Sequence, residues 1–306
     1  MHTPPPSFTS YEQCFASLRD TEFWEPYVHA VLARHGLPIA PIEAGFVGRF
    51  PTYLVGDVVV KLFGAYRTWR ADSETELAVQ QRLSDLSAVP APRLLAFGRL
   101  YDGKDPWPYL VTERMAGTPW REATLSSRQR LQIAGQLGKV ARTVHAVTVP
   151  DAPIFQTSRL SDRTVDGAAW HRQVMPGHLA AQIDSYVIRE WPEQRLVHAD
   201  LTQDHIFITD RGGLSGVIDW GDAQATDPHY ELAPLHVLTF GCDKALLRAF
   251  LAGYGWNRAP DFQHRAMSAT LLHRKSNLFT AIDAIHSLQM FSTLEELAVY
   301  LWDIDE

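Results

Sequence analysis

The chain has 306 residues, 46% hydrophobic and 21% charged, with a formal net charge of −7 and a sequence pI of about 6.0. This length can bury a sizeable core, as one large or two medium domains. The negative charge argues against nucleic-acid binding, which usually needs a basic surface. No stretch approaches 18 apolar residues, no signal-peptide pattern occurs at the N-terminus, and the two cysteines are widely separated. We therefore expect a cytoplasmic protein that does not bind membranes.

The first third of the chain predicts two helices followed by a small sheet. Apolar residues recur at helical spacing between residues 10 and 36. Short apolar runs then predict five strands, with one helix between the third and the fourth. The expected strands are residues 41–44, 52–55 and 58–63, one beginning within 89–98, and 107–112, and the expected helix is 73–86.

From residue 115 onward the pattern is mainly helical. The expected helices are residues 127–147, 168–191 with a break at Pro176–Gly177, 230–240, 244–254, 261–284 and 294–301. Thr293 and Glu296 have the spacing of a capping box at the start of the last helix. We therefore predict an α+β protein of two lobes, with the sheet in residues 1–115 and a mainly helical lobe in residues 116–306.

The segment LVHADLTQDHIFITDRGGLSGVIDWGDAQATD, residues 196–227, carries the most informative pattern of the chain. Apolar runs at 195–197, 206–209 and 215–218 predict three short strands joined by loops that carry acids. Asp200 lies on the first loop, and Asp219 directly follows the last run. This placement suits phosphotransfer, in which one acid accepts the proton of the attacking hydroxyl and another holds the cation that bridges the phosphates.

HADLTQDH followed by VIDWGDA resembles the catalytic segment of the aminoglycoside phosphotransferase family, H-G-D-x-x-x-x-N and then I-D-[WF]-x-D/E. The resemblance implies a bilobal protein-kinase-like fold, with a five-stranded N-terminal lobe and a mainly helical C-terminal lobe. It also implies that Asp200 is the catalytic base and that Asp219 binds Mg²⁺. His205 stands where the family usually has Asn. We consider His205 a metal ligand, directly or through water, or a residue that only packs within the loop.

Three further features surround this segment. His198 is expected to hydrogen-bond the backbone near Asp219 and to fix the loop, with a role as catalytic acid as the alternative. Asp222 either caps a helix or contacts the substrate. Between Arg211 and Lys244 there are several acids and no Lys or Arg, a charge pattern that would attract a cationic small-molecule acceptor.

In the predicted sheet, Lys61 ends the apolar run VVVK. Such a lysine either reaches to water or is held forward by an anion, and the following helix offers Glu74 and Glu76. We predict Glu76, because it shares a helix face with Val79 and Leu83. By resemblance, the Lys61–Glu76 pair would position the α- and β-phosphates of a nucleoside triphosphate.

Two other segments are expected to contact this nucleotide. Gly45 and Gly48 occupy the place of the kinase glycine-rich loop, although two glycines three apart are also ordinary in a hairpin. Thr112, Glu113 and Met115 lie where the sheet gives way to helices. The resemblance implies a hinge there, at which the carbonyl of Glu113 and the N–H of Met115 pair with the purine. Thr112 would line the pocket and is too small to exclude either ATP or GTP.

The similarity to one subgroup, the hygromycin B kinases, extends over nearly the full chain. It is carried by FASLRDTEFWEPYVHAVLARHGLP, VVVKLFG, WPYLVTERMAGTPWRE and the closing DF…LLH…LEELAVYLW. It departs in residues 271–287, which are more acidic in those kinases. Here this chain has Arg274, Lys275 and only one acid, Asp283, which is a candidate substrate contact.

The resemblance thus implies an ATP- or GTP-dependent O-phosphotransferase that acts on an aminoglycoside or aminocyclitol antibiotic such as hygromycin B and so confers resistance. One alternative is a metabolic kinase of the same fold that acts on choline, homoserine or a thiosugar. Another is a pseudokinase that only binds nucleotide. A protein kinase is disfavoured, because Ala199 replaces the arginine of the H-R-D motif.

Overall fold

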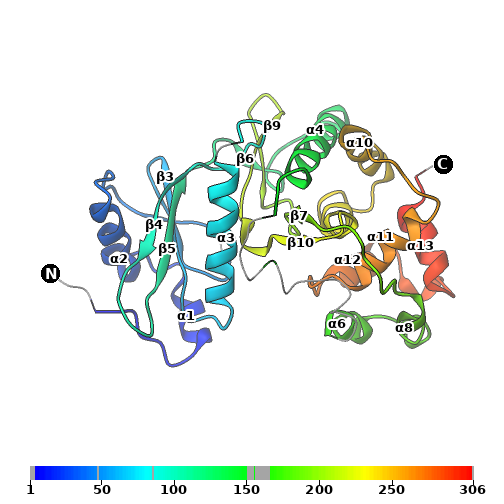
Figure 1. The fold of residues 1–306 in the computed structure, drawn as a ribbon, viewed down its shortest axis with the longest axis horizontal. Coiled ribbons are helices and arrows are strands. Elements are labelled where there is room, and N and C mark those ends of the chain that lie inside the picture. The colour runs from blue at the N-terminus through cyan, green and yellow to red at the C-terminus, as the bar shows by residue number, and fades with distance from the viewer. Residues whose placement is uncertain (1–3, 47, 85, 150–154, 156–165, 305–306) are drawn as a thin grey trace. The chain divides into compact units, whose positions relative to one another are not determined.

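The computed structural model describes residues 4–46, 48–84, 86–149, 155 and 166–304. The chain divides into two compact units (Figure 1). The first unit comprises Met1–Ser87 and Ala91–Met115, and the second comprises Ala88–Pro90 and Ala116–Glu306. Among the described residues, no helix has both the length and the apolar composition needed to cross a membrane.

The first unit is built on a five-stranded antiparallel sheet with the order β1-β2-β3-β5-β4. The strands are β1 (Glu43–Ala44), β2 (Thr52–Val55), β3 (Val58–Leu62), β4 (Leu94–Arg99) and β5 (Pro108–Glu113). The five expected strands are thus present. Gly56 in the tight turn between β2 and β3 has a φ of 56°, which glycine adopts without steric cost.

Helices cover both faces of this sheet. On one side are α1 (Tyr11–Ser17) and α2 (Thr21–Arg34), and on the other is α3 (Trp69–Leu83) (Figure 1). Alternate strand residues, including Val60 and Leu62 of β3, pack in the core shared with α1 and α2. Because successive side chains of a strand point to opposite faces, Lys61 is turned towards the face of α3.

The second unit holds two small sheets. Their strands are β6 (Thr118–Pro119), β7 (Arg195–Val197), β8 (Ile206–Ile208), β9 (Leu214–Val217) and β10 (Gln224–Thr226). One sheet has the order β6-β8-β9, and the other pairs β10 with β7. The three strands expected in this region, β7, β8 and β9, are confirmed. The pairing of β10 with β7 brings the chain after Asp219 back beside the start of the loop that carries Asp200.

The rest of the second unit is mainly helical. Its helices are α4 (Ser127–His145), α6 (Asp166–Val174), α7 (Gly177–Ala180), α8 (Ile183–Tyr186), α9 (His229–Pro234), α10 (Lys244–Tyr254), α11 (Phe262–Leu271), α12 (Leu278–Ile285) and α13 (Leu294–Trp302). A π-helical turn, Leu235–Thr239, follows α9. The helices α4 and α10 lie side by side (Figure 1). This close approach is possible because Gly138 of α4 has no side chain. A Cβ at this position would be only 2.1 Å from the carbonyl oxygen of Phe250.

Three sequence predictions about helices were wrong in detail. The helix expected at 168–191 is replaced by α6, α7 and α8. The helix expected at 261–284 is interrupted at residues 272–277, between α11 and α12. At α13, Thr293 accepts the N–H of Glu296 as predicted, but the carboxylate of Glu296 accepts the N–H of Ser292 and not that of Thr293.

Candidate functional site

The loop between β7 and β8 is shaped by a buried histidine. His198 donates from Nε2 to the carbonyl of Ile218 at 2.9 Å, and its Nδ1 accepts the N–H of Asp200 at 3.2 Å. Burial lowers the pKa of His198, which favours the neutral ring. The predicted hydrogen bond to the backbone beside Asp219 is therefore confirmed. A neutral ring with both nitrogens in use positions the loop and has no proton to give to a reactant.

A buried carboxylate holds the same loop from α9. Glu231 is 1% exposed, and its oxygens accept the backbone N–H of His198 at 2.7 Å and that of Ala199 at 3.2 Å. These two bonds help to keep Ala199 in a left-handed conformation with a φ of 63°. The sequence showed Glu231 only as one acid of the stretch between residues 211 and 244. Its neighbours in the sequence, ELAPL, are apolar, which was the available sign of burial.

The acidic stretch itself is less open to a ligand than the sequence suggested. Besides Glu231, Asp227 is buried, and it pairs with His229 at 2.7 Å and with Arg265 at 3.9 Å. Asp222 ends the short turn Trp220–Asp222 that follows Asp219, and it is partly exposed. Part of the negative charge in this stretch therefore stabilises the fold and does not face solvent.

Asp219 and His205 form a pair of possible metal donors. His205 donates from Nδ1 to the carbonyl of Asp200 at 2.8 Å, and its Nε2 lies 3.5 Å from the carboxylate of Asp219. A nitrogen and an oxygen at this separation can both contact one cation. Among the described residues, no group of three or more His, Cys, Asp or Glu side chains is arranged to hold a metal ion. A cation here would thus take its other ligands from water or from a bound phosphate.

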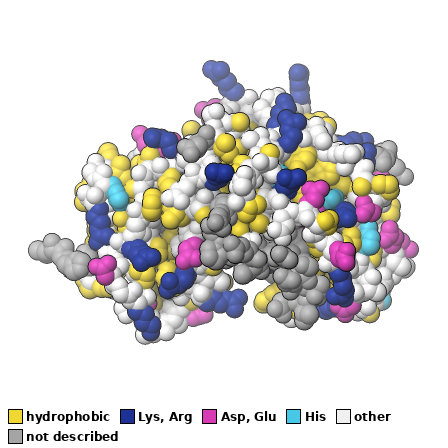
Figure 2. All heavy atoms as spheres, viewed as in Figure 1, with side chains coloured by type: hydrophobic (Ala, Val, Ile, Leu, Met, Phe, Trp, Pro, Cys, Tyr) yellow, Lys and Arg dark blue, Asp and Glu magenta, His cyan; other side chains and the backbone are white. Residues whose placement is uncertain are grey.

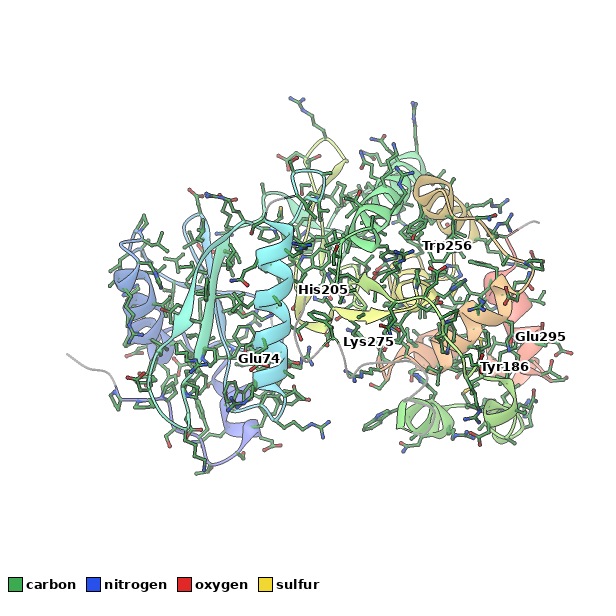
Figure 3. All side chains as sticks on the ribbon, viewed as in Figure 1. Glu74, Tyr186, His205, Trp256, Lys275 and Glu295 are labelled. Atoms are coloured by element: carbon green, nitrogen blue, oxygen red, sulfur yellow. The ribbon has the colours of Figure 1, made fainter. Side chains whose placement is uncertain are left out.

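The carboxylate of Asp200 contacts a lysine, Lys275, which Figure 3 labels together with His205 in the second unit. The ammonium group of Lys275 contacts both oxygens, Oδ2 at 2.5 Å. The side chain of Asp200 is 6% exposed and that of Lys275 is 32% exposed. Lys275 lies in the segment between α11 and α12, 75 residues from Asp200 in sequence. The sequence singled out Lys275 as a departure from the hygromycin B kinases, but no local signal places it at Asp200.

Two further acids of the second unit, Asp204 and Asp283, have structural partners. Asp204, in the loop of Asp200, pairs with the guanidinium of Arg121 at 2.5 Å. Asp283 lies on α12, where its carboxylate accepts the N–H of Leu288 at 2.7 Å. Asp283 is an exposed residue.

In the first unit, Lys61 and Glu76 form the predicted ion pair. The ammonium of Lys61 is 2.7 Å from Oε2 of Glu76, and their side chains are 16% and 7% exposed. Glu74, labelled in Figure 3, is exposed on α3, as its position on the helix predicted. The pair ties β3 to α3 and fixes the ammonium of Lys61 on the side of the sheet that α3 covers.

The two glycines before β2 differ in what they do. Gly45 donates its N–H to the carbonyl of Thr52 at 2.8 Å, and a Cβ on Gly45 would be 2.8 Å from that oxygen. Only glycine allows this close approach. A Cβ on Gly48 would meet no atom within 4 Å. Of the two residues between them, the one at position 47 lies outside the described residues.

The end of the sheet carries the residues predicted for a hinge. Thr112 pairs with Val59 in the ladder of β5 and β3. The carboxylate of Glu113 accepts two bonds from the guanidinium of Arg93, the shorter at 2.7 Å. Met115 is partly exposed and is the last residue of the first unit.

Charges of both signs are interspersed on the face of the molecule drawn in Figure 2. The visible Lys and Arg side chains are scattered over both units, with Asp and Glu side chains between some of them.

Solved structures with a similar fold include phosphotransferases. A family model described as "Phosphotransferase enzyme family" matches residues 38–267. The GDP and kanamycin complex of an APH(2″) enzyme aligns with a TM-score of 0.66 and 19% identity over 92% of this chain and 99% of that chain.

Two other solved structures extend the range of ligands. An aminoglycoside phosphotransferase from Streptomyces rimosus, bound to ADP and streptomycin, aligns with a TM-score of 0.55 and 19% identity, over 83% of this chain and 97% of that chain. Spectinomycin phosphotransferase, bound to ADP and spectinomycin, gives 0.54 and 14%, over 89% and 97%. At these identities the likeness concerns the fold, which is the kinase-like fold that the sequence predicted.

Proposed function

Because the chain belongs to the phosphotransferase enzyme family, we propose that it transfers the γ-phosphate of ATP or GTP to a hydroxyl group of an aminoglycoside or aminocyclitol. The observation that carries this proposal is the environment of Asp200. Its carboxylate is almost buried, on a loop that the neutral ring of His198 and the carboxylate of Glu231 hold in place. A base so positioned can accept a proton without reorganising.

In the proposed reaction, the acceptor hydroxyl gives its proton to a carboxylate oxygen of Asp200. The acceptor oxygen forms a bond to the γ-phosphorus as the bond from that phosphorus to the β–γ bridging oxygen breaks. The nucleoside diphosphate leaves with the electron pair of the broken bond. Asp200 then loses its proton to solvent, which returns the enzyme to its starting state.

We assign nucleotide binding to the first unit. The Lys61–Glu76 pair would position the α- and β-phosphates, since its ammonium is fixed by a carboxylate at 2.7 Å. Gly45 and Gly48 would lie over the phosphates, and the backbone of Glu113 and Met115 would pair with the purine. Thr112 would line the purine pocket. Neighbouring structures solved with ADP or GDP support a nucleotide as the donor.

Asp219 and His205 would hold Mg²⁺, with the remaining ligands from phosphate oxygens and water. A carboxylate suits Mg²⁺, whereas an imidazole is a poorer partner, so His205 would bind through water. When bound, the ion neutralises charge that develops on the β- and γ-phosphate oxygens. A nucleoside triphosphate donor also supports the cytoplasm as the place of the reaction.

For the acceptor we propose a cationic antibiotic, with hygromycin B as one candidate, so that phosphorylation would confer resistance. Kanamycin, streptomycin and spectinomycin in the neighbouring structures support this class of small molecule. The partly exposed Asp222 and the exposed Asp283 would contact its amines.

The test is transfer of labelled γ-phosphate from ATP and from GTP to a panel of aminoglycosides and aminocyclitols, with choline, homoserine and a thiosugar as rivals. We expect a phosphorylated aminoglycoside or aminocyclitol. Transfer to one of the rivals alone would replace the proposed acceptor class, and nucleotide binding without transfer to any of them would indicate a pseudokinase.

The same assay tests Asp200. Asp200→Asn keeps the shape of the side chain but cannot accept the proton, so turnover should fall by about 10²–10⁴. Nucleotide affinity, measured by calorimetry, should stay near the wild-type value. Near wild-type turnover of Asp200→Asn would show that another group is the base.

A further inference from the structure

The ammonium of Lys275 compensates the negative charge of Asp200, and the carboxylate can still accept a proton. An ionised carboxylate has about four lone-pair sites. The ammonium of Lys275 contacts each oxygen once, and the backbone bonds of the loop involve the N–H and the carbonyl of Asp200, not its carboxylate. Each oxygen therefore keeps a site at which an acceptor hydroxyl can donate. The acceptor would share Asp200 with a resident cation.

Lys275 is held in this place by its own segment. The N–H of Lys275 donates to Nδ1 of His273 at 3.0 Å, and the N–H of Arg274 donates to the hydroxyl of Tyr230 at 3.0 Å. Nε2 of His171 donates to the carbonyl of His273 at 2.9 Å. Both histidines are buried, and the ring of His273 stacks on Tyr230 with a centroid distance of 4.0 Å. The backbone of residues 273–275 is thus fixed by buried groups.

Two further basic residues adjoin the pair of Lys275 and Asp200, one in space and one in sequence. His205 lies 3.7 Å from Oδ2 of Asp200, and its other nitrogen is directed at Asp219. On its own segment, Lys275 follows the exposed Arg274. An acceptor hydroxyl bonded to Asp200 therefore lies within a few ångströms of a lysine ammonium that has an arginine as its chain neighbour.

We propose that Lys275 determines acceptor specificity by excluding acceptors with an ammonium group next to the reacting hydroxyl. The enzyme would phosphorylate a hydroxyl flanked by hydroxyl, ether or anionic groups, and amines elsewhere on the acceptor would be tolerated. This inference rests on the proposed function and narrows its acceptor class. At about 4 Å, repulsion between two ammonium groups near a protein surface corresponds to roughly 10- to 10³-fold in binding.

The test compares a neutral cyclitol with an aminocyclitol that differs by one amine next to a hydroxyl. The enzymes are the wild type, Lys275→Met, which keeps an unbranched chain without charge, and Lys275→Arg, which keeps the charge. We expect the wild type to have a higher kcat/KM for the neutral compound. Where it phosphorylates the aminocyclitol, the phosphate should be on a hydroxyl remote from the amine. Lys275→Met should reduce this preference by about tenfold or more, and Lys275→Arg should retain it.

Equal losses of kcat/KM for both compounds in Lys275→Met would overturn the inference, because the preference would then be unchanged. Unchanged thermal unfolding and nucleotide affinity confirm that the variant is folded. Equilibrium binding of the same two compounds gives a readout independent of turnover. Transfer to no member of the aminoglycoside and aminocyclitol panel would overturn the proposed function. Even then, a ratio of dissociation constants that is the same in the wild type and in Lys275→Met contradicts the role of Lys275.

Discussion

The two histidines of the loop between β7 and β8 differ in whether a ring nitrogen is left for a ligand. His198 uses both ring nitrogens within the protein, one on the carbonyl of Ile218 and one on the N–H of Asp200. His205 uses Nδ1 on the carbonyl of Asp200, and its Nε2 is directed at Asp219. At the scale of single residues, His205 is thus the histidine of this loop that can act at a metal.

Replacing His205 by Asn tests this role. Asn can still donate to the carbonyl of Asp200, and it supplies an amide oxygen, which Mg²⁺ prefers to nitrogen. We expect the Mg²⁺ concentration for half-maximal turnover to fall, by roughly tenfold, and the preference for Mn²⁺ over Mg²⁺ to decrease. The measurement is turnover against the concentration of each metal in the wild type and in His205→Asn, which tests whether His205 acts at the metal. Identical metal curves would leave Asp219 as the protein donor and make His205 a packing residue.

At the scale of secondary-structure elements, the ion pair of Lys61 and Glu76 connects β3 to α3. Both side chains are mostly buried, so each charge depends on the other for compensation. Loss of either partner should therefore have much the same effect as loss of both.

A double-mutant cycle measures this coupling. Lys61→Ala and Glu76→Ala should each weaken nucleotide binding, and their combination should show a coupling free energy of about 1–3 kcal/mol. Glu74→Ala is the matched control on the same helix, and it should combine additively with Lys61→Ala because Glu74 is exposed. Additive losses of nucleotide affinity for Lys61→Ala and Glu76→Ala would show that the two residues do not act as a pair in nucleotide binding.

The contact between α4 and α10 depends on glycine at one position of α4. A Cβ on Gly138 would collide with the backbone of Phe250 and Tyr254, whereas a Cβ on Gly135 would meet only the carbonyl oxygen of Ala249, at 3.6 Å. We expect Gly138→Ala to lower the free energy of unfolding by about 1–3 kcal/mol. Gly135→Ala should leave it unchanged or raise it by up to about 1 kcal/mol, through helix propensity. Urea unfolding of both variants tests this, and equal stabilities would refute the close packing.

At the scale of the whole molecule, buried neutral histidines link stability to pH. Burial lowers the pKa of His171, His198 and His236. Each donates one ring N–H to a backbone carbonyl, that of His273, Ile218 and Leu301 respectively. Protonation on acidification would place a charge in an apolar interior, so acid should destabilise the second unit.

His236 gives this prediction a number, since desolvation lowers its pKa from 6.5 to about 4. The unfolded chain binds the proton more tightly, so this stabilisation is complete above pH 6.5 and is lost as the pH falls towards 4. The loss attributable to His236 should be about 2 kcal/mol by pH 5. His236→Gln can still donate to the carbonyl of Leu301 but does not titrate. Urea unfolding at pH 7 and pH 5 should show a smaller loss in His236→Gln, and equal losses would mean that His236 does not titrate as its burial requires.

Local patterns were sufficient for the parts of the chain in which one face is buried along a single element. The strand Thr52–Val55 and the helix Lys244–Tyr254 have the bounds that periodicity predicted. The same periodicity selected Glu76 over Glu74 as the partner of Lys61, because alternate faces of a strand and successive turns of a helix are set by backbone geometry. The motif around Asp200 likewise identified the loop and its neighbour Asp219.

Only the tertiary structure determined the position of the segment between α11 and α12. Apolar spacing predicted one helix through residues 261–284, but the structure has a break at 272–277. At this break the ring of His273 and the hydroxyl of Tyr230 accept backbone N–H groups. This break lets Lys275 reach Asp200. Periodicity reports which face of an element is buried, not which distant group it meets. The contact between Lys275 and Asp200 depends on packing across 75 residues of chain and has no local signature.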